Sequence, residues 1–302
     1  MQATVQQVGK KFVLTHNGVR IAKSQYMSYI EEAAQKAGLS IAGVAQEEIV
    51  EKTEFSIRER FEFLTQYVDL VSDKVMPSLI ITGDGGLGKT YTVMNTLSDK
   101  GLTDVADSMG DEDEIGEDGE VTVYGDYAVI KGFATARGLY NTLYEHKDRI
   151  VIFDDCDSVL KDPVALNLLK GALDSYGDRW ISWKSERMLG EGTPSIFKFK
   201  GQVIFISNMK LSDINQAVRS RSICVDVSMT KEEKIDRMHQ ILEEGSFMAD
   251  YAMETKMAAV GFIDEMKDKA SELSIRTLIT VTKLASKGGT NWKRLAEYTI
   301  SA

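Results

Sequence analysis

The sequence predicts an α/β fold in which a parallel sheet is sandwiched by helices and followed by an all-helical domain. Continuous apolar runs such as 150–153 and 202–206 are typical of parallel strands that are buried on both faces. These runs alternate with segments of helical spacing, and beyond residue 228 only helical spacing remains. We therefore expect three parts, which are a small N-terminal α+β module (1–55), an α/β core (56–228) and a helical domain (229–302).

The N-terminal module is predicted from a hairpin and a helix. Asn17-Gly18 lies between two apolar-rich arms, which is a strong signal for a tight turn between antiparallel strands. A helix is expected at about 25–37, ended by Gly38, whereas residues 40–55 are ambiguous. The module either packs on the core or serves as an adaptor, and the sequence leaves both alternatives open.

The core is expected to begin with an amphipathic helix over 56–74 that leads into a strand at 79–81. Asp162-Pro163 is predicted to open a later helix as its N-cap and first-turn proline, and a hairpin is expected at 180–200. The other expected strands are 127–130, 150–153, 202–206 and 223–227, and the other expected helices are about 89–99, 135–147, 213–219, 231–244, 250–270, 274–287 and 291–300.

The net charge of −10 arises from one segment of the chain. Residues 103–126 contain ten Asp and Glu and no Lys or Arg, so the rest of the chain is neutral overall. We interpret this acidic loop as a solvated surface insertion, because its spacing is not that of an EF-hand calcium site. No apolar run approaches the roughly 18 residues of a membrane span, and the N-terminus lacks the pattern of a signal peptide. We therefore expect a cytoplasmic protein that does not contact membranes.

The most specific motif is the segment Gly83-Asp-Gly-Gly-Leu-Gly-Lys-Thr90, which fits the phosphate-loop pattern. The glycines let consecutive backbone N–H groups face one anion, and a helix beginning near Lys89 adds its positive dipole end. Lys89 can reach the β- and γ-phosphates, and the Thr90 hydroxyl can ligate Mg²⁺. The expected nucleotide-binding residues are Gly83, Asp84, Gly85, Gly86, Leu87, Gly88, Lys89, Thr90 and Tyr91.

Three polar residues at strand ends are predicted to complete a site for phosphoryl transfer. Asp154 ends a buried strand, where it can hold Mg²⁺ opposite Thr90, and Asp155 is the candidate to polarise the attacking water. Asn208 ends the next strand along the chain, so it can hydrogen-bond the γ-phosphate and the water. The alternatives are that the two acids merely close a strand and that Asn208 caps a turn.

These motifs, with the helical tail, resemble the AAA+ ATPase superfamily over about residues 56–302. On that resemblance, Gly83–Thr90 is Walker A, Ile152–Asp155 is Walker B, Ile206–Asn208 is sensor 1, and residues 229–302 are the lid. Arg221 is similar to the arginine finger that reaches into a neighbouring subunit's nucleotide, with Arg219 as the fallback. Arg276, at the start of a lid helix, resembles sensor 2, which contacts the γ-phosphate in cis. A surface arginine is the alternative for each of these three.

Two departures from the family pattern bear on the substrate. Walker B usually ends in Asp-Glu, whereas here it ends in Asp154-Asp155, as it does in the superfamily-3 viral helicases. The segment 131–134 is too short for the pore loop of AAA+ machines that thread proteins. The expected hairpin (180–200) is similar to an insertion that projects toward the ring pore in another AAA+ branch. There its residues Lys184, Arg187, Lys198 and Lys200 could follow a phosphate backbone, and Trp183 could stack on a base, or the hairpin could pack its aromatics on the core.

We thus expect a Mg²⁺-dependent ATPase that forms a homo-oligomeric ring and that remodels or translocates single-stranded or duplex DNA. The resemblance implies that the ring is a hexamer. The alternative is a protein remodeller or assembly chaperone whose partner binds the N-terminal module or the acidic loop. A nucleotide-gated scaffold that scarcely hydrolyses ATP is a third hypothesis. The chain also resembles uncharacterised AAA+ ATPases of large tailed bacteriophages, which implies a viral protein in the host cytoplasm.

Overall fold

The structure is a computed structural model, and it describes residues 2–8, 11–16, 19–46, 54–108, 124–132, 134–184, 192–289 and 291–301. Two compact units divide the chain between Glu54 and Phe55. Most of the acidic loop (109–123) and residues 185–191 of the expected hairpin, including Arg187, lie outside the described residues. The predictions made for them stay predictions.

The smaller unit, Met1–Glu54, contains a four-stranded sheet with strand order β3-β2-β1-β4 and one helix. The bounds are β1 (Gln2–Val8), β2 (Lys11–His16), β3 (Val19–Ser24), α1 (Met27–Lys36) and β4 (Ser40–Gln46). The two arms of the expected hairpin pair antiparallel as β2 and β3, whereas its predicted turn, Asn17-Gly18, lies outside the described residues. Helix α1 is followed by Gly38, which has a φ of 64°. Ile30 and Ala34 of α1 are buried with Val5 and Leu14 of the sheet. The sequence did not predict β1, and it left β4, which pairs parallel with β1, unassigned.

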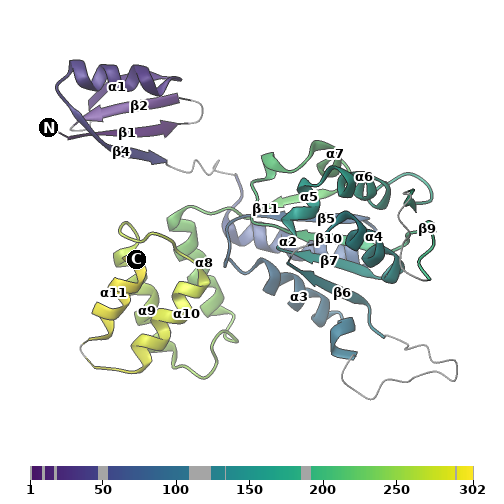
Figure 1. The fold of residues 1–302 in the computed structure, drawn as a ribbon. Coiled ribbons are helices and arrows are strands. Elements are labelled where there is room, and N and C mark those ends of the chain that lie inside the picture. The colour runs from purple at the N-terminus through teal and green to yellow at the C-terminus, as the bar shows by residue number, and fades with distance from the viewer. Residues whose placement is uncertain are drawn as a thin grey trace. The chain divides into compact units, whose positions relative to one another are not determined.

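The larger unit, Phe55–Ala302, is built on a five-stranded parallel sheet with strand order β11-β5-β10-β7-β6 (Figure 1). The strands are β5 (Ser78–Thr82), β6 (Tyr127–Lys131), β7 (Ile150–Asp154), β10 (Gln202–Ile206) and β11 (Ile223–Asp226). Every residue of β5, β7 and β10 is buried, as the continuous apolar runs predict. The predicted α/β fold with a helix-covered parallel sheet is therefore confirmed.

Helices cover both faces of this sheet, and the alternation of side chains along the strands supplies one core to each face. Ile80, Phe153 and Phe205 pack with α4 (Ala136–Glu145), α5 (Asp157–Lys161) and α6 (Pro163–Ala172). Leu79, Ile152 and Ile204 pack on the other face with α2 (Ile57–Ser72) and α3 (Lys89–Asp99). The remaining short helices are η1 (Val105–Ser108), η2 (Leu211–Asp213) and α7 (Gln216–Arg219).

Side-chain caps set the starts of several helices where the sequence places them. Ser56 and Glu59 form a capping box at α2, and the Asp162 carboxylate accepts hydrogen bonds from the first turn of α6, whose first residue is Pro163. The expected helix over 213–219 is wrong in extent, because only its last turn is α-helical and a 3₁₀ turn precedes it. The five-residue helix α5 was not predicted, since so short a segment carries little periodicity.

Four helices follow the sheet, as predicted, and they share a core of their own. Their bounds are α8 (Lys231–Glu243), α9 (Met253–Met266), α10 (Ile275–Ser286) and α11 (Trp292–Ser301). Val260 and Ile263 of α9 and Leu278 of α10 are fully buried in this core. These helices belong to the same compact unit as the sheet, so the expected domain boundary near residue 228 stays a prediction.

The hairpin at 180–200 consists of β8 (Trp180–Ser182) and β9 (Ile196–Lys198), which pair antiparallel. The Trp183 ring packs against the Tyr140 ring of α4, with 5.7 Å between their centroids. This contact favours the alternative in which Trp183 packs on the core rather than stacking on a base. Trp180 is on the outside, with 55% of its surface exposed.

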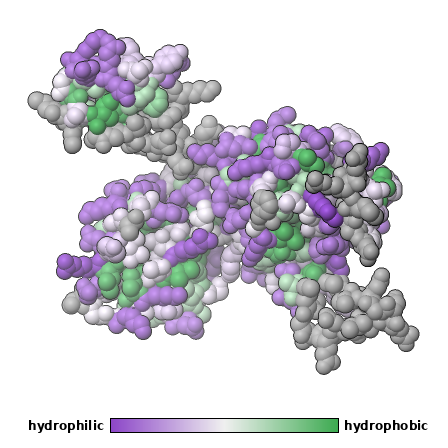
Figure 2. Space-filling view, viewed as in Figure 1, coloured by the Kyte–Doolittle hydropathy of each residue, from purple (hydrophilic) through white to green (hydrophobic). Residues whose placement is uncertain are grey.

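Hydrophilic side chains cover much of the visible face of the molecule, with smaller hydrophobic areas between them (Figure 2). Among the described residues, no helix is both long enough and apolar enough to cross a membrane.

Candidate functional site

The glycine loop that follows β5 adopts backbone conformations that other residues rarely take. Gly83 and Gly86 have φ values of 135° and 70°. A Cβ on Gly83 would lie 2.9 Å from the carbonyl carbon of Val227, and a Cβ on Gly86 would lie 3.0 Å from the Cβ of Ser274. The loop is therefore enclosed by the segment after β11 on one side and by the start of α10 on the other.

Lys89, the first residue of α3, folds its side chain back into the loop. Its Nζ donates to the carbonyl oxygens of Gly83 at 2.6 Å and Asp84 at 2.7 Å, and to Oδ1 of Asn208 at 2.9 Å. None of these three acceptors carries a full charge, and only 5% of Lys89 is exposed. Burial consequently lowers the pKa of Lys89, against the opposing effect of the nearby Asp155, Asp84 and Asp154 carboxylates.

Asp154 and Thr90 lie together, as predicted. The Thr90 hydroxyl donates to Oδ1 of Asp154 at 3.0 Å, and Asp154 is buried at the end of β7, with 7% of the residue exposed. Lys131, at the end of β6, places Nζ 3.9 Å from Oδ2 of the same carboxylate. A hydroxyl and a carboxylate are the hard oxygen donors that Mg²⁺ prefers alongside water and phosphate. The pair fits such an ion, although no cluster of three or more His, Cys, Asp or Glu suited to a metal occurs among the described residues.

Asn208 connects Lys89 to Asp155. Besides accepting from Lys89, its amide donates from Nδ2 to Oδ1 of Asp155 at 2.7 Å. Asp155 has a positive φ of 55°, which is uncommon for a residue with a side chain, and its N–H donates to the carbonyl of Ile206 at 3.0 Å. The turn after β7 is thereby tied to the end of β10, and both polar side chains reach the edge of the sheet where Lys89 lies.

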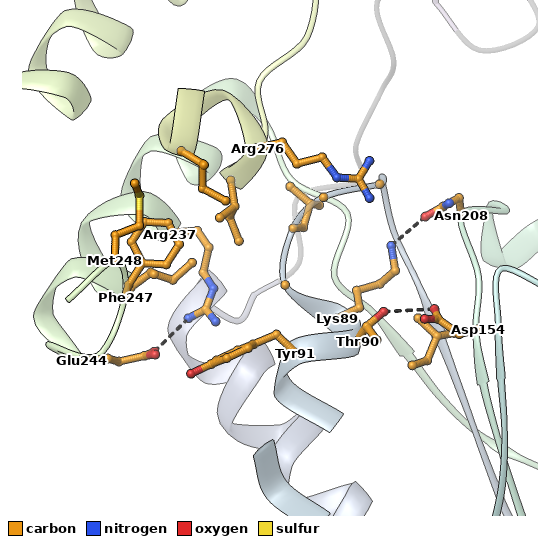
Figure 3. A pocket seen from close by; sticks show the side chains of 18 of the residues that line it. Lys89, Thr90, Tyr91, Asp154, Asn208, Arg237, Glu244, Phe247, Met248 and Arg276 are labelled. Atoms are coloured by element: carbon orange, nitrogen blue, oxygen red, sulfur yellow. Dashed lines mark hydrogen bonds and ion pairs between the residues drawn. The ribbon is translucent and has the colours of Figure 1, made fainter. Parts of the chain in front are cut away.

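The C-terminal helices form the other wall of the site. The N–H of Ile275, at the start of α10, donates to the carbonyl of Gly86 at 2.8 Å. Arg276 follows it and lines the pocket (Figure 3). On α8, Nζ of Lys234 lies 2.7 Å from Oδ2 of Asp84. Two of the helices thus contact the glycine loop directly.

A pocket of about 480 Å³ lies between the glycine loop and these helices (Figure 3). Gly85, Gly86, Leu87, Gly88, Lys89, Thr90, Tyr91, Asp154, Asp155, Asn208 and Arg276 line it, and all of them were predicted site residues. Gly83 and Asp84, also predicted, are in the same loop and hold the Lys89 ammonium through their carbonyls, and Asp84 in addition pairs with Lys234.

Several lining residues were not identified from the sequence. They are Arg237, Ile241, Glu244, Ser246, Phe247, Met248, Ile275 and Ile279, whereas the lining residue Ile206 belongs to the segment that resembles sensor 1. One signal was present, because positions 234, 237 and 241 recur at helical spacing and so share a face of α8, which its C-cap residue, Glu244, continues. That spacing does not reveal what the face contacts.

Arg221 and Arg219 do not line this pocket. Nη1 of Arg221 donates to the carbonyl of Ala217 at 2.8 Å, and both guanidinium groups are partly buried near the end of α7. Within one chain these arginines therefore do not meet the groups around Lys89.

No protein-family model matches the chain. A curated relative, an uncharacterised 36.7 kDa protein from the nrdC–mobD intergenic region of bacteriophage T4, is 28% identical over 281 residues, which cover 86% of this chain and 80% of the relative. This relative agrees with the expected likeness to phage proteins.

Three solved structures are similar to the chain. The FIGL-1 AAA domain in complex with ADP has 13% identity and a TM-score of 0.36 and covers 83% of this chain and 81% of its own. PCH-2 of C. elegans has 12% identity, a TM-score of 0.41 and coverages of 81% and 67%. Drosophila ORC bound to DNA has 13% identity, a TM-score of 0.43 and coverages of 92% and 74%. All three TM-scores are below 0.5, so the chemistry of the site rests on its own geometry.

The enclosure of Gly83 predicts a matched pair of stability effects. Gly83→Ala should lower the free energy of unfolding by about 2 to 5 kcal/mol, because a positive φ and a backbone clash act together. Gly101→Ala also has a positive φ (75°) but no atom within 4 Å of the new Cβ, so its loss should be only about 1 to 2 kcal/mol. Urea unfolding of both variants measures the difference, and equal losses would contradict the enclosure.

Proposed function

We propose that this protein is a Mg²⁺-dependent ATPase of the AAA+ type. The observation that carries the proposal is the buried Lys89 ammonium, held by loop carbonyls and Asn208 next to the Thr90–Asp154 pair. A desolvated cation without a carboxylate among its hydrogen-bond acceptors favours binding of an anion, and a glycine loop at a helix N-terminus favours phosphate. The pocket beyond it has room for the rest of a nucleotide.

Each polar residue then has a role. Lys89 binds the β- and γ-phosphates, Thr90 and Asp154 would hold Mg²⁺, and Arg276 contacts the γ-phosphate from α10. When bound, Mg²⁺ neutralises charge that develops on the phosphate oxygens. Asp155 orients the attacking water and accepts its proton, and Asn208 positions Asp155 through their 2.7 Å hydrogen bond.

We further propose that hydrolysis takes place between subunits of a ring, with a hexamer as the expected size. Arg221 does not line the pocket of its own chain, so a role in hydrolysis would require it to reach the nucleotide of a neighbouring subunit. An arginine supplied in trans stabilises the charge of the transition state in phosphoryl transfer.

The proposed macromolecular substrate is DNA, and a protein is the second candidate. Trp180 of the hairpin is exposed, as are Tyr176, four residues before it, and Lys184, four residues after it, and such residues provide stacking surfaces and a positive charge in proteins that bind single strands. Nearby Lys198 and Lys200 already pair with Asp178 at 2.6 Å and Asp148 at 3.8 Å, which weakens this surface. The N-terminal unit supports the protein candidate, since a separate compact unit can serve as an adaptor.

Lys89→Ala should reduce the affinity for Mg²⁺·ATP about a hundredfold or more, because it removes the buried cation of the phosphate site. Isothermal titration calorimetry measures this affinity. Lys100→Ala is the matched control, since Lys100 is at the other end of α3 and pairs with Asp73. Equal affinities of wild type and Lys89→Ala would refute nucleotide binding at this loop.

Arg221→Ala should retain ATP affinity and lose most of its turnover, because the guanidinium acts on the neighbouring site and not on its own. Arg219→Ala should have the smaller effect. Steady-state phosphate release and ATP binding, measured on the same samples, test the assignment. Normal turnover of Arg221→Ala would rule it out as the finger.

Single-stranded DNA should stimulate ATP turnover if DNA is the substrate, and Trp180→Ala should remove that stimulation without changing the rate in the absence of DNA. Turnover that is indifferent to DNA would favour the protein substrate instead. The measurement is the steady-state rate with and without an oligonucleotide at low salt, because phosphate contacts weaken as salt rises.

A further inference from the structure

The first C-terminal helix, α8, lies with one face along the glycine loop. Lys234 at the start of this face pairs with Asp84 of the loop, and Ile241 and Glu244 further along line the pocket. Arg237 lies between them on the same face and also lines the pocket (Figure 3). The proposed roles of Lys89, Thr90 and Arg276 leave the purpose of this third cation of the pocket unexplained.

The Arg237 guanidinium is buried with little charge compensation. Only 6% of the residue is exposed, and the guanidinium carbon lies 3.8 Å from the centroid of the Phe61 ring. Nη1 donates to Oε1 of Gln240 at 3.3 Å and lies 3.6 Å from Oε1 of Glu244, whose side chain is 48% exposed. Nε is buried and has no hydrogen-bond partner among the described residues. Burial lowers the pKa of Arg237, and the negative charge of Glu244 only partly opposes this effect.

Arg237 also occupies a particular place along the pocket. A Cβ on Gly88, the residue before Lys89, would lie 3.9 Å from Nη2 of Arg237. In Figure 3 the guanidinium lies between the Lys89–Thr90–Asp154 end and the Phe247–Met248 end, next to Tyr91. If the terminal phosphates occupy the first end and the apolar second end receives the base, the group in between is the α-phosphate with its ribose.

We infer that Arg237 binds the α-phosphate of the nucleotide and so provides an anion subsite separate from that of Lys89. This inference rests on the proposed function of the pocket. The phosphate supplies negative charge beyond the 3.6 Å ion pair with the half-exposed Glu244, and Phe61 holds the guanidinium plane in place by a cation–π contact. Arg237 is therefore a nucleotide-binding residue contributed by α8, and it makes the affinity depend on how α8 packs on the loop.

The test compares three anions that fill different parts of the pocket. Pyrophosphate fills only the β and γ positions, tripolyphosphate also fills the α position, and ATP adds the nucleoside. Arg237→Met should weaken ATP and tripolyphosphate by the same factor, about tenfold, and change pyrophosphate by less than about twofold. Arg237→Lys should show the same selectivity with a smaller loss, because it keeps the charge without the planar contact. Calorimetry with each anion and Mg²⁺ gives the three affinities.

Arg60→Met is the matched control, since Arg60 is equally buried and binds Glu233 and the Ser228 carbonyl, but does not line the pocket. It should change thermal stability without changing the ratio of ATP to pyrophosphate affinity.

Three results would overturn the inference. Equal weakening of all three anions by both Arg237 variants would make Arg237 a structural residue of α8. Weakening of ATP alone would place its contact at the ribose or base, and unchanged affinities would exclude any contact.

Failure of the proposed function looks different, because the wild type would then bind none of the three anions and Lys89→Ala would have no effect. If Arg237→Met does not fold, Arg237→Lys tests the inference by the same comparison of its affinities for ATP, tripolyphosphate and pyrophosphate with those of the wild type.

Discussion

The site depends on one interaction, the burial of the Lys89 ammonium inside the glycine loop. A desolvated ammonium is stable only if polar groups surround it, and here they come from the Gly83 and Asp84 carbonyls and from Asn208. The loop must therefore keep the backbone conformations that its glycines allow. Strand β10 must also end where the Asn208 side chain can accept a hydrogen bond from Lys89. Uncharged acceptors stabilise the cation without neutralising it, which leaves it able to attract phosphate.

The sheet supplies the alignment that this interaction requires. The central strand β10 pairs with β5 on one side and β7 on the other, with Ile206 opposite both Ile81 and Asp154. The three strands consequently end at one level, and the loop, the acidic pair and Asn208 converge at the carboxyl edge, where ligands bind in open α/β sheets. The helices α8 and α10 close this edge by contacts to Asp84 and Gly86, so nucleotide binding and the packing of these helices are expected to be coupled.

Much of this arrangement could be predicted from the sequence because its determinants are local. The glycine loop, Asp154 and Asn208 directly follow or end buried strands, and parallel strands bring their ends together. Arg237 was not predicted as a site residue, because it reaches the pocket only through the packing of α8 on the glycine loop. Helical spacing alone does not show which surface a helix face contacts. Strand β1 is rich in Gln, and β4 pairs with it across about 40 residues, so neither has a strong local signal. The sequence also did not show which tryptophan of the hairpin faces solvent. Trp180 and Trp183 are only three residues apart, yet Trp180 is exposed and Trp183 is partly buried.

The central claim is that ATP is hydrolysed at an interface between copies of this chain, with Lys89 in one subunit and Arg221 in the next. The most direct measurement is the ATP turnover per subunit, with Mg²⁺ present, over a wide range of protein concentration. We predict a turnover that is low in dilute solution, rises as subunits assemble and then reaches a plateau. A measurable turnover that is constant upon dilution to the monomer, or no turnover at any concentration, would contradict the account.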